Sequence, residues 1–248
     1  MFLTAFNYCI GLFSDEKDVF CTSIHGGRTD NRWSRLAGPL FLTYYFRFTK
    51  VPHERVLDLL HKSSNQIMNT MRCFVSTPRE GEMFFQYQGD IIDINRIGDA
   101  KAERIRLQLD SLPFHMQVMY DNKGYYYELR YWENRFDRIQ LEIFLICYEY
   151  VLNAMLEERS VRRLKKHLPE EVYPKHYFVD GQELNKEAGY EILPELEYKE
   201  SVKAYILDEE YNKKPYGAWG ELYIMDHKPN FYSDAIENPY GPGTLYKT

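Results

Sequence analysis

Two apolar runs separated by a short polar segment constrain the fold of this chain more than any other feature. The first run, residues 19–24, lies between a charged residue and a pair of glycines, and the second, residues 40–48, is rich in Phe, Tyr and Leu. Runs of this length with β-branched and aromatic residues are typical of strands. The polar segment between them, residues 25–35, fits a short helical crossover. The sequence therefore predicts two buried strands at the centre of a layered α/β unit.

Size, charge and cysteine usage exclude several classes of protein. The 248 residues suffice for one large domain or two small ones. A formal net charge of −6 argues against a general nucleic-acid or anionic-membrane partner. The four cysteines contain no Cys-x-x-Cys pair, which predicts buried thiols in a reducing cytoplasm and no metal site. The apolar residues 1–13 lack a basic segment and are too short to span a bilayer, so we expect a cytoplasmic protein.

Apolar spacing predicts the elements of the first hundred residues. Residues 1–12 are apolar on nearly every side, as in a helix buried all round, and we expect such a start in a piece of a longer protein. A second helix follows Pro52 and ends near Arg72. Residues 83–87 and 91–94 are predicted strands. Residues 105–109 fit a further strand, but residues 100–107 fit a helical turn equally well.

A hairpin followed by a long helix is the clearest local pattern. Residues 114–120 and 125–131 flank a turn whose Asp and Asn favour turning and whose Gly supplies a positive φ. Asp137 is the predicted N-cap of the long helix. Its main apolar stripe is predicted to comprise Ile139, Ile143, Ile146, Tyr150 and Ala154. A second set is predicted to thicken that stripe: Leu141, Leu145, Tyr148, Leu152 and Met155.

The remainder of the chain changes character twice. Residues 157–166 form a charge run, most simply a solvated helix end, with nucleic-acid binding as a weak alternative. A polar, proline-containing linker with one strand at residues 177–179 follows. Strands are then predicted at residues 202–208 and 220–224, separated by a turn, and a Pro/Gly loop leads to the last four residues.

The motif order of the first 155 residues resembles the condensation domain of a nonribosomal peptide synthetase. In that family a strand ends in a Gly-Arg pair, here Gly27 and Arg28, and leads through a short helix to (I/V)-Gly-x-Phe-Val-Asn-Thr-x-x-x-Arg. Gly38, Thr43 and Arg47 match this motif, while a leucine replaces its Asn. The hairpin, a Tyr-x-x-x-x-Phe-Asp segment and the closing helix continue the same order.

The segment after residue 199 resembles part of an adenylation domain. The first matching block follows the pattern Tyr-x-Leu-Asp and then Pro-x-Gly-x-x-Gly-Glu-Leu-Tyr-Ile. Its matching residues are Tyr205, Leu207, Asp208, Pro215, Gly217, Gly220, Glu221, Leu222 and Tyr223. The later block matches at Asn238, Pro239, Gly243, Leu245, Tyr246 and Thr248. The stretch after residue 224 departs from the family's Gly-rich sequence.

These resemblances imply a fold class and a division of the chain. Residues 1–158 would be the C-terminal-lobe part of a chloramphenicol-acetyltransferase-like (CoA-dependent acyltransferase) condensation fold, of the α/β class. Residues 159–199 would be a linker. Residues 200–248 would be a small β element, a remnant of an adenylation domain.

The resemblance also implies a function that this chain does not perform alone. Condensation in the family depends on His-His-x-x-x-Asp-Gly, and no adjacent His pair occurs here; we expect that motif in an N-terminal lobe upstream of Met1. We predict no catalytic residue. His25 is the only His in a motif-like setting, and a structural role is the simpler interpretation. The predicted channel or structural residues are Gly27, Arg28, Gly38, Thr43 and Arg47. The adenylation-like candidates are Gly220, Glu221, Tyr246 and Thr248.

The implied role is support of amide-bond formation between carrier-bound aminoacyl or peptidyl thioesters. The expected partners are peptidyl carrier protein domains, the missing condensation lobe and adjoining synthetase modules. No cofactor is expected on this chain alone, because phosphopantetheine belongs to the carrier. The alternative is a non-catalytic interaction protein that docks a carrier protein or a synthetase.

Overall fold

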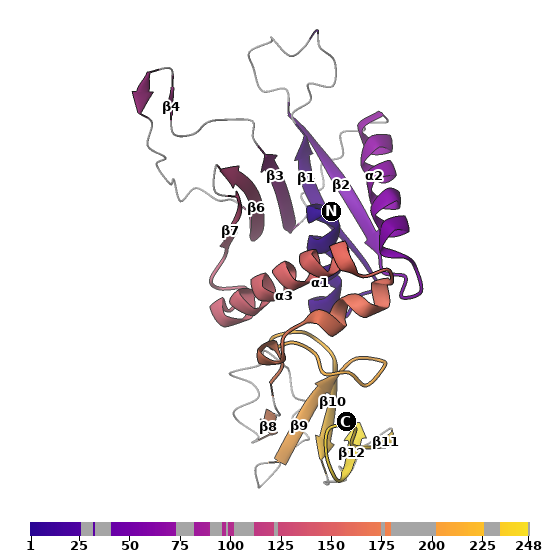
Figure 1. Ribbon diagram of the computed structural model, residues 1–248. Helices are drawn as coiled ribbons and strands as arrows, with labels where there is room; N and C mark the ends of the chain where they lie inside the picture. The colour runs from indigo at the N-terminus through magenta and orange to yellow at the C-terminus, as the bar shows by residue number, and fades with distance from the viewer. Residues whose placement is uncertain are drawn as a thin grey trace.

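The computed structural model describes residues 1–25, 32, 41–72, 82–89, 96–97, 99–101, 112–121, 124–174, 177–179, 202–225 and 234–247. In this part of the chain, two five-stranded sheets carry most of the structure, one stacked beyond the other in Figure 1. The first sheet has the order β2-β1-β3-β6-β7 and the second β11-β12-β10-β9-β8. Residues 26–31 and 33–40, and the strands predicted at 91–94 and within 102–109, lie outside the described residues.

The first unit contains the first sheet and every helix within the described residues. Its strands are β1 (Asp18–His25), β2 (Leu42–Thr49), β3 (Met83–Gly89), β6 (Phe114–Asp121) and β7 (Gly124–Tyr131). Its helices are α1 (Phe2–Ser14), α2 (Val56–Arg72), α3 (Arg138–Glu157) and the 3₁₀ helices η1 (Val161–His167) and η2 (Glu170–Val172). A small ribbon is formed by β4 (Arg96–Ile97) and β5 (Ala100–Lys101). These ranges confirm the predicted helix after Pro52 and the hairpin at residues 114–131.

The arrangement of the first two strands differs from the prediction. β1 and β2 pair antiparallel, with Cys21 opposite Phe46, whereas a helical crossover would join parallel strands. β2 also lies at the edge of the described sheet, and β3 occupies its centre. Tyr44, Phe46 and Phe48 are buried, while Thr43 and Arg47 on the opposite face of the strand are exposed. This alternation is typical of an antiparallel strand with one solvated face, so the prediction of a fully buried central strand was wrong for β2.

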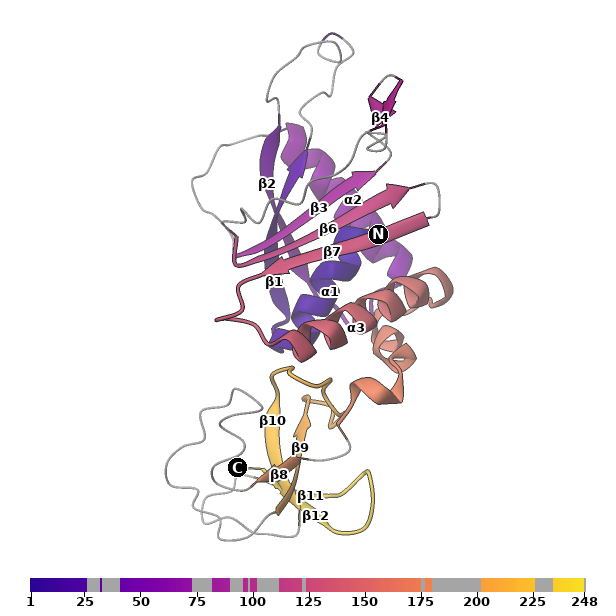
Figure 2. The same cartoon turned by 90° about the vertical axis from the view of Figure 1, so that its left-hand side faces the viewer.

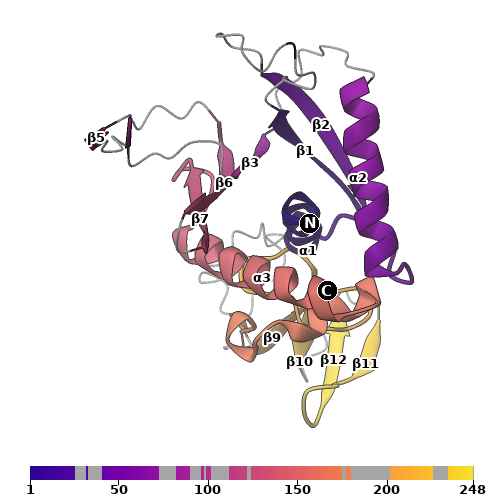
Figure 3. The same cartoon turned by 45° about the horizontal axis from the view of Figure 1, so that its top comes forward.

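Helix α1 lies at the centre of the first core, as its all-round apolar sequence predicts. Figure 3 shows α1 surrounded by the first sheet, α2 and α3. Phe6 is fully buried, and its ring centroid lies 5.1 Å from that of Phe85, 5.9 Å from Phe114 and 6.0 Å from Phe144. Clusters of tilted and edge-on rings stabilise a core beyond the area that they bury. The aromatic-rich composition is therefore used in packing.

The prediction of buried thiols is confirmed for three cysteines. Cys9, Cys21 and Cys147 are free and buried, while Cys73 lies outside the described residues. Asn7 donates to the Cys21 sulfur at 3.1 Å, but burial dominates and raises the pKa of the Cys21 thiol to about 12. A thiol with so high a pKa is almost wholly protonated near neutral pH and is therefore a poor nucleophile.

Helix α3 begins as predicted but buries a different stripe. The Asp137 carboxylate accepts a hydrogen bond from the Gln140 backbone N–H at 3.0 Å, which confirms the N-cap. Ile139 and Tyr150, two members of the predicted main stripe, are 57% and 41% exposed. The buried side chains are Leu141, Phe144, Cys147, Tyr148, Val151, Leu152, Ala154 and Met155. Both sides of the helix are apolar, so periodicity alone could not decide which side contacts α1.

Among the described helices, α3 alone is long and apolar enough to cross a membrane by length and composition. Here it packs against α1, and the Tyr148 ring meets that of Tyr127 edge-on at 5.3 Å. Its apolar character is therefore accounted for by the core that it covers. The predicted localisation stays a prediction.

The charge run at residues 157–166 is not a solvated helix end. Helix α3 stops at Glu157, Ser160 forms a β-bridge with Arg55, and η1 begins at Val161. Val161 and Leu164 of η1 are 1% and 0% exposed and belong to the first core. The two apolar residues pack the run against the first unit. Because most residues of the run are charged, its composition alone did not indicate this packing.

The second unit is an antiparallel sheet with a small core of its own. Its strands are β8 (Tyr177–Val179), β9 (Val202–Leu207), β10 (Glu221–Met225), β11 (Ala235–Glu237) and β12 (Thr244–Lys247). The buried residues of its core are Tyr205, Leu207, Tyr223 and Leu245. Because β8 pairs with β9, part of the predicted linker belongs to this sheet. The division at residues 158 and 199 stays a prediction.

The buried stripe of α3 can be tested with a matched pair of substitutions. Phe144→Ala should lower the free energy of unfolding by about 3–5 kcal/mol, because it removes a 3% exposed ring from the aromatic cluster. Ile139→Ala, on the exposed side of the same helix, should change it by less than about 0.5 kcal/mol. Urea unfolding followed by circular dichroism measures both. Equal losses in the two variants would contradict the burial described here.

Candidate functional site

The condensation-type candidates within the described residues lie on the first sheet. Thr43 and Arg47 are on β2, while Gly27, Arg28 and Gly38 lie outside the described residues. Arg47 is 72% exposed and its Nε donates to Asp18 Oδ1 of the neighbouring strand at 2.9 Å. Hydrogen bonding from Arg47 holds the pKa of the Asp18 carboxyl below its ordinary value. In this structure Arg47 therefore braces the β1–β2 edge from the solvent side.

His25 ends β1 opposite Leu42, and its side chain is only partly buried. In the described part of the chain, no group of three His, Cys, Asp or Glu side chains is placed to hold a metal ion. The roles assigned to these residues from the sequence stay predictions.

The adenylation-type candidates lie on the second sheet, apart from the first set. Glu221 on β10 pairs with Lys247 on β12 at 3.3 Å, and Tyr246 lies opposite Ile224. Gly220 precedes β10 where a Cβ would lie 2.7 Å from the Leu207 carbonyl oxygen, so only glycine fits there. Thr248 lies outside the described residues. The match at Gly220 thus has a packing reason of its own.

A buried lysine joins the two units, and sequence reasoning missed it. Lys214, in the loop of residues 208–220 between β9 and β10 (the junction loop), is 2% exposed. Its ammonium group donates to the Leu12 carbonyl oxygen at 2.6 Å and to Asp15 Oδ1 at 2.7 Å. Leu12 lies in the last turn of α1, whose carbonyl groups carry the negative end of the helix dipole. The end of α1 therefore supplies both partners of a cation from the second unit.

Backbone contacts hold the same loop against three elements of the first unit. The Trp219 N–H donates to the Phe13 carbonyl oxygen at 2.7 Å, and the Tyr216 N–H donates to that of Val172 at 2.9 Å. Gly217 has φ 76°, and a Cβ there would lie 2.4 Å from Cγ of Gln140, whose amide donates to the Gly217 carbonyl oxygen. The junction loop thus packs on α1, η2 and the first turn of α3. Figure 2 shows this region between the two sheets.

Ion pairs surround the start of the junction loop. Lys165 Nζ of η1 donates to Asp208 Oδ2 at 2.8 Å and to Glu210 Oε2 at 3.1 Å. Asp208 Oδ1 accepts from the backbone N–H groups of Glu210 and Asn212, each at 2.9 Å. Burial alone would raise the pKa of Asp208, but the bonds from Lys165 and Asn212 outweigh it and leave the pKa below its ordinary value. The carboxylate is therefore held ionised at the junction.

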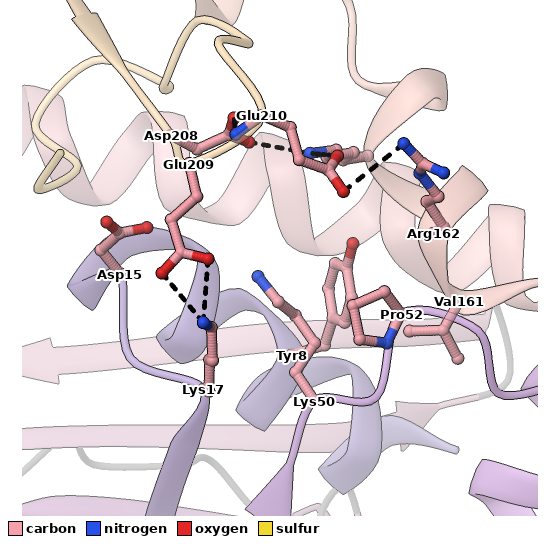
Figure 4. Close-up of a pocket in the computed structure, with 11 residues that line it drawn as sticks. Tyr8, Asp15, Lys17, Lys50, Pro52, Val161, Arg162, Asp208, Glu209 and Glu210 are labelled. Atoms are coloured by element: carbon pink, nitrogen blue, oxygen red, sulfur yellow. Dashed lines mark hydrogen bonds and ion pairs between the residues drawn. The ribbon is translucent and has the colours of Figure 1, made fainter. Parts of the chain in front are cut away.

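Cavities lie on both sides of the Lys165–Asp208 pair. One of about 80 Å³ is bordered by Tyr8, Lys50 and Pro52 of the first unit and by Glu209 and Glu210 of the junction loop (Figure 4). A second, of about 250 Å³, is bordered by Lys166, Lys213 and Asn212. A third, apolar cavity of about 130 Å³ lies between Phe136, Phe144 and Trp219. The polar cavities offer ammonium groups and carboxylates, which suits binding of a small charged group.

Comparison with known proteins places the fold. No protein-family model matches the chain, and no curated protein matches it. A holo four-domain nonribosomal peptide synthetase bound to AMP and glycine matches with a TM-score of 0.55 at 13% identity, over 65% of this chain and 15% of that one. The starter condensation domain of rhizomide synthetase RzmA gives 0.53 at 11% identity, over 65% and 42%. The epimerization domain from the third module of tyrocidine synthetase B gives 0.51 at 14%, over 63% and 41%.

About two thirds of the chain therefore has the chloramphenicol-acetyltransferase-like fold of condensation domains, which confirms the predicted fold class. The chain spans less than half the length of each of these three solved chains.

The buried lysine contact predicts a specific weak point. Asp15→Asn removes the charge that matches Lys214 while keeping a side chain that tolerates the positive φ of residue 15. It should cost about 1–3 kcal/mol of unfolding free energy and speed amide exchange at Trp219. Glu209→Gln breaks only a pair whose side chains are 66% and 71% exposed, and should leave both measurements unchanged. Equal effects of the two substitutions would contradict the assigned role of Lys214.

The Asp208 carboxylate predicts a pH dependence of the junction. A carboxyl group whose pKa is lower in the folded than in the unfolded protein stabilises the fold at pH values above its unfolded-state pKa. That stability is lost as the pH falls from the ordinary value of 3.8 through the lower folded value. Thermal unfolding between about pH 2 and pH 6 should therefore show a steeper acid loss for the native chain than for Asp208→Asn. Parallel profiles would show that Asp208 is not held ionised by the junction.

Proposed function

We propose that this protein is part of a nonribosomal peptide synthetase and supports amide-bond formation between carrier-bound aminoacyl or peptidyl thioesters. The observation that carries the proposal is the shared fold with two synthetase domains and one whole synthetase, each at a TM-score above 0.5. The motif residues Thr43 and Arg47 on the solvated face of β2 add to it. In this proposal the chain supplies one wall of the channel that brings the two thioesters together.

The proposed division of labour gives this chain positioning roles and no proton-transfer role. Amide formation requires the attacking amine and the thioester carbonyl to be held together, with a polar partner at the amine. Thr43, Arg47 and the candidates Gly27, Arg28 and Gly38 would shape the channel wall. The second lobe would bring the His-His-x-x-x-Asp-Gly motif. Phosphopantetheine would enter on the carrier protein as the tether of the substrate.

The second unit would be a remnant of an adenylation domain, namely strands of its small β-subdomain. Its motif residues Gly220, Glu221 and Tyr246 form turns and strand pairs here, and the sequence contains no Ser/Thr/Gly-rich phosphate loop. We therefore propose that the second unit neither binds ATP nor activates an amino acid by itself.

A non-catalytic docking protein is the second candidate. Large aromatic side chains at the β1–β2 edge favour it, because Phe20 is 56% and Phe41 58% exposed. Exposed aromatic side chains are enriched where proteins bind one another. In this alternative the fold is kept for contact with a carrier protein or a synthetase.

Reconstitution separates the two candidates. We expect no dipeptide from the chain alone, and dipeptide formation once a separate polypeptide with the His-His-containing lobe and two loaded carrier proteins are added. Arg47→Ala should slow that reaction about ten- to a hundredfold by misplacing the channel wall. Arg138→Ala, which removes an 80% exposed arginine from α3, is the matched control and should leave the rate unchanged.

Two results would count against the proposal. Binding of carrier proteins with no dipeptide under any combination would favour the docking protein. Dipeptide formed by the chain alone and lost on His25→Ala would make His25 catalytic and overturn the positioning roles assigned above.

A further inference from the structure

The 80 Å³ cavity at the junction has an unmatched positive charge in its wall. Its four carboxylates are each paired with a cation of the protein. Asp15 meets Lys214 at 2.7 Å, Asp208 meets Lys165 at 2.8 Å and Glu209 meets Lys17 at 2.8 Å. Glu210 meets Lys165 at 3.1 Å and Arg162 at 3.5 Å.

Lys50 borders the same cavity but pairs with none of these four carboxylates. It follows β2, and its backbone N–H donates to the Lys17 carbonyl oxygen at 2.7 Å, which fixes the start of its side chain. Figure 4 shows its ammonium group pointing into the cavity beside the Tyr8 ring. No hydrogen bond or ion pair joins this ammonium group to any residue that the structure describes, although the side chain is partly buried.

The charged groups around this ammonium group balance one another and leave its own charge uncompensated. Burial lowers the pKa of Lys50, and the positive charges of Lys214 and Lys165 lower it further. Asp15 and Asp208 act in the opposite direction with smaller effects. An anion at this position would therefore relieve repulsion among the three lysines and would supply the missing partner of Lys50.

We propose that this cavity is a binding site for a small oxyanion of the phosphate type, held by the ammonium group of Lys50. The cavity volume is several times the roughly 10–15 Å³ that one water molecule needs by the same measure, so a group of about five heavy atoms fits. Because its walls come from α1, η1 and the junction loop, the bound anion would contact both units. The site is separate from the β1–β2 channel residues and does not depend on the proposed function.

Two kinds of ligand carry such an oxyanion. One is free inorganic phosphate, and the other is a larger molecule with a phosphate group. The cavity is bordered by exposed side chains such as Glu209, 71% exposed, so a phosphate monoester could enter from that side. The test therefore compares inorganic phosphate, glycerol phosphate and acetate, each at matched ionic strength with sodium chloride.

The experiment measures anion binding to the full chain by calorimetry and by thermal unfolding. Inorganic phosphate should bind saturably and raise the Tm of the native chain. Lys50→Met should weaken that binding about tenfold or more, because a hydrogen-bonded charge is lost. Lys62→Met removes the same charge from an exposed position on α2 and should bind phosphate as the native chain does. Binding of glycerol phosphate as well would identify phosphate monoesters as the source.

A second measurement covers the case in which Lys50→Met does not fold. The ¹³Cε resonance of Lys50 in the native chain reports its pKa, which should rise when phosphate is added and should not respond to chloride. The proposal is overturned if that resonance does not respond, if phosphate binds Lys50→Met as tightly as the native chain, or if acetate and chloride act as phosphate does. The last result would mean that ionic screening, and not a phosphate site, accounts for the response of Lys50.

Discussion

The burial of one ammonium group sets the relation between the two units of this protein. A charged lysine that is 2% exposed is tolerated only where nearby groups replace the water that it has lost. For Lys214 those groups are a carbonyl oxygen and a carboxylate at the end of α1, on the other unit. The conformation of the junction loop therefore depends on the first unit, even though the second sheet has its own small core.

Other features of the junction follow from this contact. With Lys214 in place, the Gly217 carbonyl oxygen accepts a hydrogen bond from the side-chain amide of Gln140 on α3, and the Trp219 N–H donates to a backbone carbonyl of α1. Ala218 enters the first core. Lys165 then faces Asp208, so that cavities remain on either side of the pair. The polar cavity with Lys50 lies where the surfaces of the two units meet around paired charged groups.

Local structure could be predicted from the sequence because local chemistry determines it. The hairpin turn requires a positive φ at Gly124, observed at 135°, and Asp137 caps α3 as its position before an apolar helix indicates. The buried helix α1 was identified because it is apolar on every side. The resemblance of short motifs to condensation domains agrees with the fold that the chain shares with two solved chains at 13% identity or less.

Long-range arrangement could not be obtained in this way. The antiparallel pairing of β1 with β2 and the choice of buried stripe on α3 depend on neighbours far apart in the chain. Lys214 is the clearest case, because two adjacent lysines in a turn are ordinarily solvent-exposed. The positions of Leu12 and Asp15, 202 and 199 residues away, explain its burial.

The central claim is that the junction holds the two units as one body in solution. Backbone ¹⁵N relaxation tests it most directly by comparing the rotational correlation times of amides in β6 and in β10. We predict one correlation time for both sheets, that of a single particle of 29.8 kDa. A markedly shorter correlation time for β9, β10 and β12 than for β3 and β6 would contradict the account, because it would mean that the second sheet tumbles independently.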